Sequence, residues 1–458
     1  MKLAIVGGGW AGMAAAVAAA DAGADVTVLE ATRLLGGRAR LLDATRPDGR
    51  PLRLDNGQHI LIGAYAETLA LMQRLGMDLD ACLLRLPLGL PYPDGSGLLT
   101  PTWAAHWPAP LDAVAAIATA RGWGWADRWA LVRASIGWRR MGFVCAPSMT
   151  VAQLCARLPL RVVDELIEPL CVSALNIPGA QASAQVFLNV MRDALFGKGH
   201  AALGASNLLL PRTDLSALTP QAAARWLDTQ HPNRTRMRLG TRVLGLQRQA
   251  TGWRLHGQQD GAPWDGLFDR VIWATAAGPA AQAMGEAATG ARDANDERTA
   301  DALLAWAEPA AGLAFTAITT VYAWAPGARL ASPMLALRAT PAAPAQFVFD
   351  RGQLNPADEA AQGVLAFVVS ASVGEREAVQ AAVLQQAAHQ LGLKNLQAVQ
   401  TVVEKRATFA CTPGLRRPAT EIAPGLWAAG DYVDGPYPAT LEGAVRSGLS
   451  AARQALAL

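Results

Sequence analysis

Cysteine is scarce in this chain, which has five in 458 residues. An odd number of thiols cannot all pair in disulfides, and no two of them have the C-x-x-C spacing of redox motifs and many zinc sites. The scarcity excludes a disulfide framework and gives no reason to expect a metal, and it predicts a protein of a reducing cytoplasm. The five are Cys82, Cys145, Cys155, Cys171 and Cys411.

Charge and long apolar runs are scarce too. Charged residues make up 17% of the chain, the formal net charge is +3, and the basic residues are scattered, so we do not expect a nucleic-acid partner. No window holds the roughly 18 uninterrupted apolar residues of a transmembrane helix. Lys2 is followed at once by an apolar segment that reads as a folded strand, not as a signal peptide. We expect a cytoplasmic protein, soluble or peripheral on the inner face of the cell membrane.

Apolar residues are plentiful, at 52% of the chain. Single cores stop growing at roughly 250–300 residues, so a chain of this length predicts two domains. The first unit is visible at the N-terminus, where residues 3–6 read as a strand, 10–22 as a helix that ends at Gly23, and 25–30 as a second strand.

The turn of this β-α-β unit carries a dinucleotide fingerprint. Gly7, Gly9 and Gly12 fit G-x-G-x-x-G, in which the glycines allow a tight turn, an approach to a pyrophosphate and close helix packing. Glu30 ends the second strand, near the ~20-residue spacing at which a carboxylate can bind ribose hydroxyls. The pattern predicts a bound dinucleotide and leaves FAD and NAD open.

Two further segments favour FAD. Gly36-Gly37-Arg38 follows the second strand, where a backbone loop and a guanidinium can close over a diphosphate. Near the C-terminus, Gly430 and Asp431 end an apolar strand, and "PATLEG" begins a helix whose N-terminus can stabilise negative charge on a reduced flavin ring.

Residues 6–40 and 425–448 together resemble the two ends of the flavin amine oxidase and phytoene desaturase superfamily. The resemblance implies an α/β fold with a discontinuous Rossmann-type FAD domain, built from both termini and the middle of the chain. No cysteine lies near "DGPYPATLEG", so we expect FAD to be bound non-covalently. The cofactor residues that we assign on this basis are Gly7, Gly9, Trp10, Ala11, Gly12, Glu30, Ala31, Gly37, Arg38, Gly57, Gln58, the backbone of Val243, Gly430, Asp431, Thr440 and Leu441.

The middle of the chain narrows the resemblance. Residues 54–76, 173–218 and 346–353 resemble the squalene-associated FAD-dependent desaturase branch, whose bacterial members include an enzyme of hopanoid biosynthesis that reduces hydroxysqualene to squalene. The resemblance implies a long-chain isoprenoid substrate and a functional partnership with enzymes like squalene or phytoene synthase. The alternatives are a carotenoid- or squalene-type desaturase, an amine oxidase-like enzyme, and a non-catalytic flavin- or isoprenoid-binding protein at a membrane surface.

Loss of hydroxide from an allylic alcohol needs a proton donor at the oxygen and a hydride from the reduced flavin. His59 is a candidate donor, because "DNGQH" lies where related flavoproteins pass beside the cofactor, although a scaffold role is the alternative. Tyr437, near the ring-facing "PATLEG", is a second candidate or a pocket wall. We expect Asp55 to hold its own loop.

Six tryptophans and several arginines crowd residues 100–141, which suits either contact with a lipid headgroup region or a packed helix pair. A C30 substrate also needs an apolar tunnel, for which residues 100–215 offer the side chains. We read 31–60 as loop-rich and 276–301 as helical. The expected division is 1–80, 216–280 and 401–458 for the FAD domain, with 81–215 (mainly helical) and 281–400 (sheet and helices) for the substrate domain.

Overall fold

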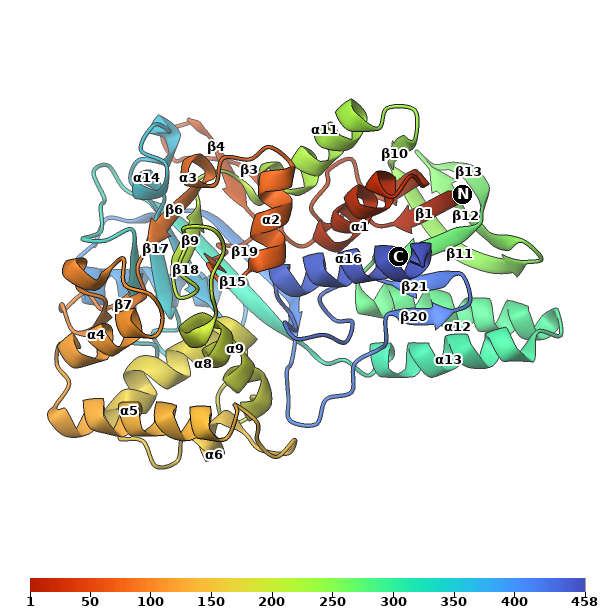
Figure 1. The fold of residues 1–458 in the computed structure, drawn as a ribbon. Helices are drawn as coiled ribbons and strands as arrows, with labels where there is room; N and C mark the ends of the chain where they lie inside the picture. Colours follow the sequence, from red (N-terminus) through yellow and green to blue (C-terminus); the bar gives the residue numbers. More distant parts are fainter. Residues whose placement is uncertain (458) are drawn as a thin grey trace.

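A computed structural model describes residues 1–457 (Figure 1). Its central feature is a six-stranded sheet made from segments that are far apart in the sequence. The strands at its centre are short apolar runs buried on both faces, as expected for a parallel sheet covered by helices. All neighbours pair in parallel except the last strand. In order across the sheet, the strands are β10 (Thr235–Leu239), β2 (Asp25–Glu30), β1 (Lys2–Val6), β14 (Arg270–Trp273), β21 (Leu426–Ala428) and β20 (Glu421–Ala423).

Helices from both ends of the chain pack beside this sheet. Helix α1 (Trp10–Asp21) lies against α16 (Leu441–Leu456) and α11 (Pro220–Gln230), and Figure 1 shows the red and dark blue helices side by side. The contact between α1 and α16 is tight, because a Cβ on Gly448 would overlap the carbonyl oxygen of Ala11. The two termini of the chain therefore form one packed layer.

A three-stranded antiparallel sheet extends the same half of the molecule. It consists of β11 (Thr241–Gln249), β12 (Gly252–Gln259) and β13 (Ala262–Phe268). A helical hairpin, α12 (Ala277–Asp293) and α13 (Glu297–Ala311), packs on β11 and β20. Residues 277–301 are helical as expected except at 294–296, where Asn295 has a left-handed φ of 60° and the Asp296 carboxylate accepts a hydrogen bond from the Thr299 N–H, which starts a new helix.

A five-stranded antiparallel sheet forms the core of the other half. One face of it is covered by α15 (Arg376–Leu391), and β18 is buried along its whole length. Its order is β16 (Met334–Ala336), β17 (Phe347–Asp350), β18 (Val364–Val369), β15 (Phe315–Trp324) and β19 (Gln397–Phe409). Two short elements, α14 (Arg351–Leu354) and η3 (Glu359–Ala361), connect β17 to β18.

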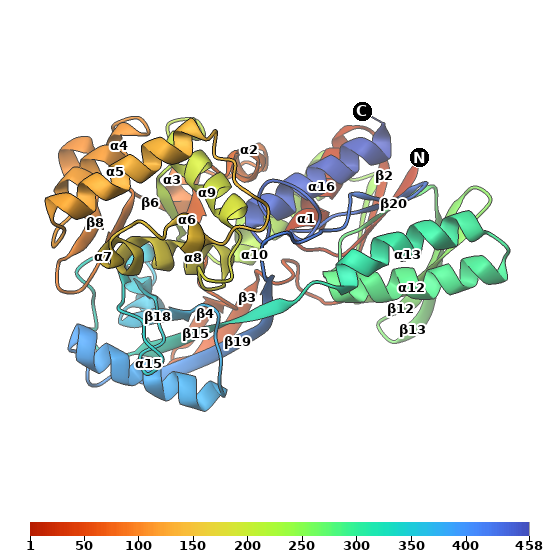
Figure 2. The same cartoon turned by 90° about the horizontal axis from the view of Figure 1, so that it is seen from below.

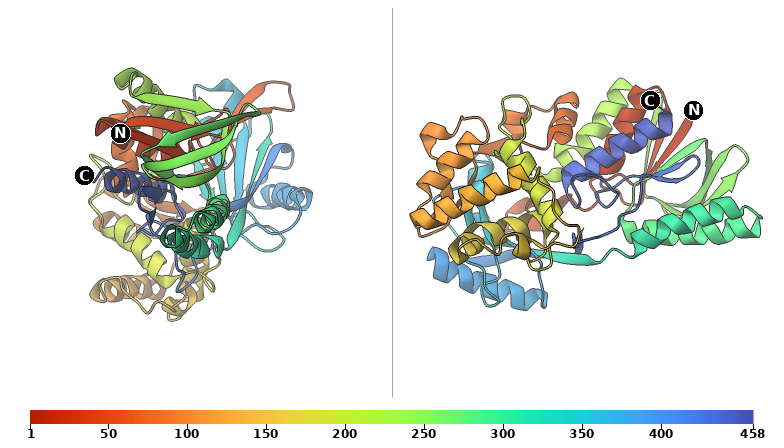
Figure 3. Two further views of the ribbon diagram at one scale, coloured as in Figure 1. Left: turned by 90° about the vertical axis from the view of Figure 1, so that its right-hand side faces the viewer. Right: turned by 60° about the horizontal axis from the view of Figure 1, so that its bottom comes forward.

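A helical region lies at the end of the molecule opposite the α12–α13 hairpin (Figures 2 and 3). Residues 160–175 are helical throughout, with a π-helical stretch over Val163–Ile167. The region contains η1 (Thr102–Ala104), α4 (Leu111–Thr119), α5 (Trp125–Arg140), α6 (Val151–Leu154), α7 (Leu160–Val162), the π-helix η2 (Val163–Ile167), α8 (Glu168–Leu175) and α9 (Ala184–Phe196).

Small elements join the two halves. Residues 31–60, expected to be loop-rich, contain the hairpin β3 (Leu41–Thr45) and β4 (Pro51–Asp55), because Leu52 and Leu54 alternate with exposed residues and pack inward. None of the helices in residues 1–457 combines the length and the apolar run needed to cross a bilayer. The other elements are α2 (Ala66–Arg74), α3 (Leu79–Cys82), α10 (Leu215–Leu218), β5 (Leu61–Ile62), β6 (Leu83–Leu86), β7 (Gly89–Pro91), β8 (Gly97–Leu99) and β9 (Leu208–Pro211).

Candidate functional site

Two glycines of the fingerprint, Gly7 and Gly12, occupy positions where a side chain does not fit. Gly7 has a φ of 114°, and a Cβ there would lie 2.6 Å from the carbonyl oxygen of Ala274 on the neighbouring β14 segment. A Cβ on Gly12 would overlap the carbonyl oxygen of Gly7. The chain passes directly from this turn into α1, whose first hydrogen bond runs from the Met13 N–H to the Gly9 carbonyl at 2.9 Å. The N-terminus of α1 therefore opens toward the turn, as an anion-binding site requires.

The Glu30 carboxylate lies beside this turn. Its Oε2 accepts a hydrogen bond from the Gly8 N–H at 2.7 Å, and its Oε1 accepts from the Thr32 N–H at 2.8 Å and from the Thr32 hydroxyl at 2.9 Å. The exposed Ala31 separates the two residues. The structure thus brings Glu30 within one hydrogen bond of the fingerprint, which suits a carboxylate that recognises ribose next to a diphosphate.

The second glycine loop packs on the first. Gly36 donates from its N–H to the Gly8 carbonyl at 3.0 Å and forms a parallel bridge with Gly9. Gly36 and Gly37 both have positive φ, at 125° and 63°, and a Cβ on Gly37 would lie 3.5 Å from the Cα of Gly9. Residues 7–12 and 36–38, which we call the cofactor cradle, form one continuous backbone surface.

Arg38 joins the cradle to the C-terminal segment. Its guanidinium forms an ion pair with the buried Asp431 and donates to the Ala407 carbonyl at 2.8 Å. The nearby Asp431 carboxylate raises the pKa of Arg38, so the guanidinium stays charged. Two residues assigned to FAD from opposite ends of the chain are therefore in contact.

The turn before α16 is held by short-range contacts. Gly430 donates from its N–H to the Ser447 hydroxyl at 3.1 Å. The Thr440 hydroxyl caps α16 by accepting from the Gly443 N–H at 2.9 Å, and Leu441 is the first residue of the helix. The positive end of α16 thus begins at the residues assigned to the flavin ring.

Glu442, in the first turn of α16, is fully buried, and the sequence interpretation missed it. Its carboxylate accepts from the backbone N–H groups of Glu67 and Thr68 at 3.1 and 2.9 Å, from the Thr68 hydroxyl at 2.7 Å and from Nε of Arg446 at 2.6 Å. It therefore caps the N-terminus of α2 from another helix. A charged residue inside "PATLEG" was the available signal, but its partner is more than 370 positions away.

His59 is held in a defined tautomer. Its Nδ1 lies 2.8 Å from the Gly57 carbonyl, and because a carbonyl can only accept, Nδ1 carries the hydrogen. Burial lowers the pKa of His59, and the charge of Arg38 lowers it further, so the neutral imidazole dominates near pH 7. Nε2 then carries a lone pair and can accept, but not donate, a hydrogen bond.

Asp55 and Arg351 support the loop that carries His59. Oδ1 of the buried Asp55 accepts from the Leu215 N–H at 2.8 Å, and its Oδ2 lies 3.9 Å from the Arg351 guanidinium. Burial raises the pKa of Asp55 to about 7. Arg351 in turn donates to Oε1 of Gln58 at 3.3 Å. These contacts match the loop-holding role expected for Asp55.

Tyr437 lies in a cluster of charged and aromatic side chains. The Arg446 guanidinium stands 4.8 Å from the centre of its ring, and the ring of Tyr65 meets it edge-on at 6.2 Å. Burial raises the pKa of Tyr437, and so does a hydrogen bond to the Asp193 carboxylate. A phenolate beside that carboxylate would be unfavourable, which makes the phenol a weak acid.

Val243 lies in β11, opposite Gly257 of β12 and beside an irregularity in the strand pairing. The start of β11 is tied to the end of β2 through the Gly240 N–H, which donates to the Thr32 carbonyl at 3.1 Å. Backbone from the middle of the chain therefore comes close to Glu30 and Ala31.

Buried polar atoms without partners test whether these residues fit a ligand. In residues 1–457, such atoms include the indole nitrogen of Trp10 in the cradle and the hydroxyl of Tyr432 beside Asp431. Two others are the hydroxyls of Thr241, at the start of β11, and Thr320, whose oxygen would lie 3.8 Å from a Cβ on Gly57. Unsatisfied buried groups are rare in proteins and costly. Their presence in or beside the assigned cofactor segments fits a bound dinucleotide.

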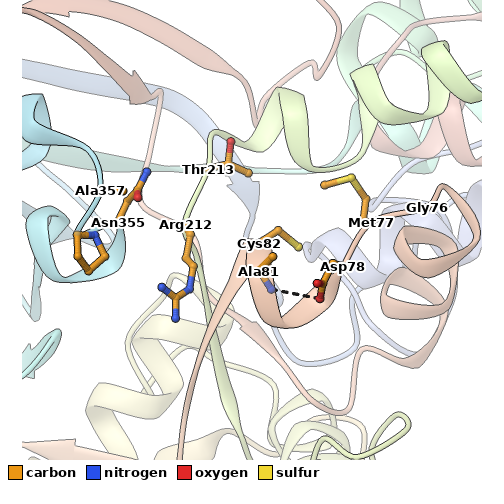
Figure 4. Close-up of a pocket in the computed structure, with 10 residues that line it drawn as sticks. Gly76, Met77, Asp78, Ala81, Cys82, Arg212, Thr213, Asn355 and Ala357 are labelled. Carbon is orange, nitrogen blue, oxygen red and sulfur yellow. Dashed lines mark hydrogen bonds between the residues drawn. The ribbon is translucent and has the colours of Figure 1, made fainter.

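An open cleft of about 530 Å³ lies elsewhere, beside α3 (Figure 4). Residues 76–78, 81–82, 212–213 and 355–357 contribute to its lining, and none of them belongs to the cofactor segments. Only Arg212 and Thr213 come from the 100–215 segment, so this cleft is not the expected apolar tunnel, which stays a prediction.

Nearly the whole chain matches one known protein family. The model of the family "flavin containing amine oxidoreductase" matches residues 10–456. The chain belongs to this family. Its cofactor is FAD, and its fold is the α/β fold expected from the sequence, so both of these predictions are confirmed. Non-covalent attachment of FAD stays a prediction, although all five cysteines are free.

Individual relatives of this flavin amine oxidoreductase agree with the family. A hydroxysqualene dehydroxylase from Rhodopseudomonas palustris is 28% identical over 476 aligned residues, which cover 99% of this chain and 98% of the relative. A zeta-carotene desaturase from Synechocystis is 38% identical over 76 residues, or 17% of this chain and 15% of the relative. The solved structure of an oxidoreductase from Methanosarcina mazei superposes with a TM-score of 0.70 at 14% identity, covering 98% of this chain and 99% of that one. The chain is an FAD-dependent oxidoreductase related to isoprenoid-processing enzymes.

Proposed function

We propose that this oxidoreductase reduces hydroxysqualene to squalene. The observation that carries the proposal is the similarity to a hydroxysqualene dehydroxylase over nearly the full length of both chains. Overall, the allylic C–O bond breaks, the leaving oxygen takes up a proton to become water, and carbon gains a hydride. When bound, reduced FAD supplies that hydride.

The residues of this chain bind and orient the cofactor in this proposal. The cradle glycines and the N-terminus of α1 face the diphosphate, and Glu30 holds the ribose. Arg38 and Asp431 close the site from the two ends of the chain. Thr440 starts α16, whose positive end favours negative charge at the ring. We assign Ala11, Ala31, Gly57, Gln58, Val243, Gly430 and Leu441 as further FAD contacts.

Whether His59 or Tyr437 donates the proton stays a prediction. The contacts work against donation by neutral His59, whose Nδ1–H is already bound to Gly57, and against Tyr437, whose phenol is a weakened acid. We propose that Nε2 of His59 accepts the hydrogen bond of the substrate hydroxyl and so orients the C–O bond. The proton would then reach the oxygen from another group.

The test uses the purified FAD-loaded enzyme under anaerobic conditions, with and without dithionite reduction. Hydroxysqualene is the substrate, and the product is identified by gas chromatography. Squalene that forms only with the reduced enzyme supports the proposal. The absence of squalene from a stably folded, FAD-loaded and reduced enzyme overturns it.

A desaturase is the second candidate, because the local similarity to a zeta-carotene desaturase has the higher identity. The same assay with oxidised enzyme and phytoene or squalene separates the two, since a desaturase produces conjugated double bonds that absorb at longer wavelength. A long-chain isoprenoid is the substrate in both cases. We also propose that a squalene- or phytoene-synthase-like enzyme supplies it, and that the protein works in the cytoplasm on the inner face of the cell membrane.

A further inference from the structure

The exposed tryptophans of this protein are all in one region. Of the 14 tryptophans in the sequence, those that are exposed in residues 1–457 are Trp103, Trp107, Trp125 and Trp129. Their neighbours Trp123 and Trp138 are buried, so the exposure is selective within a single stretch of chain. Isolated apolar residues on a surface are ordinary, but a concentration of large ones marks an interaction site.

Helix α5 has two apolar stripes. Leu131 and Trp138, two turns apart, face the core and are buried. On the opposite side, Trp125 and Trp129 are one turn apart and are 81% and 66% exposed, and Ile136 continues this stripe two turns later. A helix that needed only to pack on its own protein would carry the first stripe alone.

The preceding segment exposes the same kind of side chain. Trp103 and Trp107 stack edge-on, with ring centres 5.0 Å apart, and both are exposed. Leu111 and Val114 are exposed on the first turns of α4, which lies beside α5 at the end of the molecule (Figures 1 and 2). We call these four residues, together with Trp125, Trp129 and Ile136, the tryptophan face.

Most of the charged side chains within residues 99–144 are basic. Arg133 and Arg140 extend the exposed stripe of α5 at spacings of four residues, and Arg121 and Arg139 are exposed nearby. The only acidic residues between 99 and 144 are Asp112 and Asp127. Asp112 is buried against the Ser206 hydroxyl, and Asp127 accepts the Gly124 N–H at 2.9 Å at the start of α5.

We infer that the tryptophan face docks on the surface of an anionic bilayer. Indole rings partition to the headgroup level, and arginines at the same level bind anionic lipid. A second copy of the chain fits less well, because a symmetric contact would set arginines against arginines. The inference rests on the proposed function for its biological role, because a C30 isoprenoid substrate dissolves in the bilayer. The exposed side chains that support it do not depend on that function.

The test is sedimentation of the FAD-loaded protein with vesicles of phosphatidylcholine alone or with 30% phosphatidylglycerol (about one third anionic lipid). Two double variants are compared, Trp125→Ser with Trp129→Ser and Arg133→Gln with Arg140→Gln. The control is Val373→Ser, which removes an exposed apolar side chain outside the face. FAD content and melting temperature show that each variant is folded.

We expect the wild type and the control to bind anionic vesicles equally. The tryptophan variant should bind both vesicle types at least about tenfold more weakly, because its apolar contact is reduced. The arginine variant should lose about 30-fold on anionic vesicles, from roughly 1 kcal/mol for each arginine, and little on neutral ones. Wild-type protein that stays in solution with both vesicle types overturns the inference, and so do variants that bind like wild type.

Sedimentation velocity without lipid tests whether a second copy of the chain binds to the tryptophan face instead. A wild-type dimer that dissociates in the tryptophan variant would show that the face binds a second copy, and it would overturn the inference that the face docks on a bilayer. Turnover of detergent-dissolved hydroxysqualene, which needs no membrane, is measured in parallel. Vesicle binding without turnover would reject the proposed function and leave the docking surface standing, whereas turnover without vesicle binding would do the reverse.

Discussion

The cofactor cradle and the tryptophan face use side chains in opposite ways. The cradle is made of backbone, and Gly7, Gly12 and Gly36 are required there because a Cβ would meet another main chain. The tryptophan face is made of the largest side chains, which point into solvent instead of into the core. One surface is shaped so that a ligand can approach the main chain closely, and the other offers area and charge without a shaped recess.

This difference predicts how the two regions respond to substitution. A small added group at Gly7, Gly12 or Gly36 should destroy binding, because there is no space for it to move into. Removal of large groups from the tryptophan face should leave stability within about 0.5 kcal/mol, since exposed side chains contribute little to folding. A cradle variant that binds FAD normally, or a tryptophan-face variant that loses stability, would contradict this difference between the two regions.

The largest effect is expected for Gly12→Val. Its side chain would overlap the carbonyl of Gly7, so α1 must move away from the turn, and we expect FAD affinity to fall by more than about a hundredfold. Flavin fluorescence titration of the apoprotein measures it. The control is Gly290→Ala in α12, where nothing lies within 4 Å of the new Cβ and helix propensity should add up to about 1 kcal/mol. Normal FAD binding by the valine variant would contradict the cradle.

Glu442→Ala should have the next largest effect. It leaves Arg446 without its buried partner and uncaps the N-terminus of α2, which together should cost about 3–5 kcal/mol of unfolding free energy. Urea denaturation measures the loss. Glu286→Gln, at an exposed position of α12, serves as the control and should change stability by less than about 0.5 kcal/mol. A small loss for Glu442→Ala would show that the two helices are held together by apolar contacts alone.

Asp55 predicts a pH dependence of stability. Its pKa is raised from 3.8 to about 7, so between these values the folded state keeps a proton that the unfolded state has released. Stability should therefore fall as pH rises from about 4 to 7, by up to roughly 4 kcal/mol, and level off above that. Asp55→Asn should flatten this slope in denaturation curves taken between pH 4.5 and 8. An unchanged slope would mean that Asp55 is ionised in the folded protein.

The two regions also differ in how far they could be predicted from the sequence. The first half of the cradle could be predicted because it depends on residues close together in the sequence. Their spacing alone places Gly7, Gly9, Gly12 and Glu30 around one turn. The contact between Arg38 and Asp431 was not predicted, since no local pattern joins positions so far apart; the sequence assigned each of them only to the cofactor. Assignment of all the cofactor residues and the five-segment division of the chain stay predictions.

The helical region was less predictable for a physical reason. A tryptophan at helical spacing fits a core and a lipid surface equally well, so the pattern could not separate the buried Trp123 and Trp138 from the exposed Trp125 and Trp129. Only tertiary packing decides which stripe of α5 is covered. The same holds for Glu442 and Arg351, whose partners come from distant elements.

The smallest effect is expected for His59→Ala, which tests whether a side chain next to the cradle does chemistry. A general acid contributes about 10²–10⁴-fold to rate, whereas loss of one neutral hydrogen-bond acceptor costs about tenfold or less. The neutral imidazole of His59 carries its one hydrogen on Nδ1 and donates it to the Gly57 carbonyl, so Nε2 can only accept. We therefore expect kcat for hydroxysqualene to fall by less than about tenfold at pH 7.5, with FAD content unchanged. His59→Gln, which restores an acceptor, should recover part of the loss. If His59 were the acid, activity would instead rise as pH falls through a pKa below 6.5, and the alanine variant would lose both that rise and at least a hundredfold in rate.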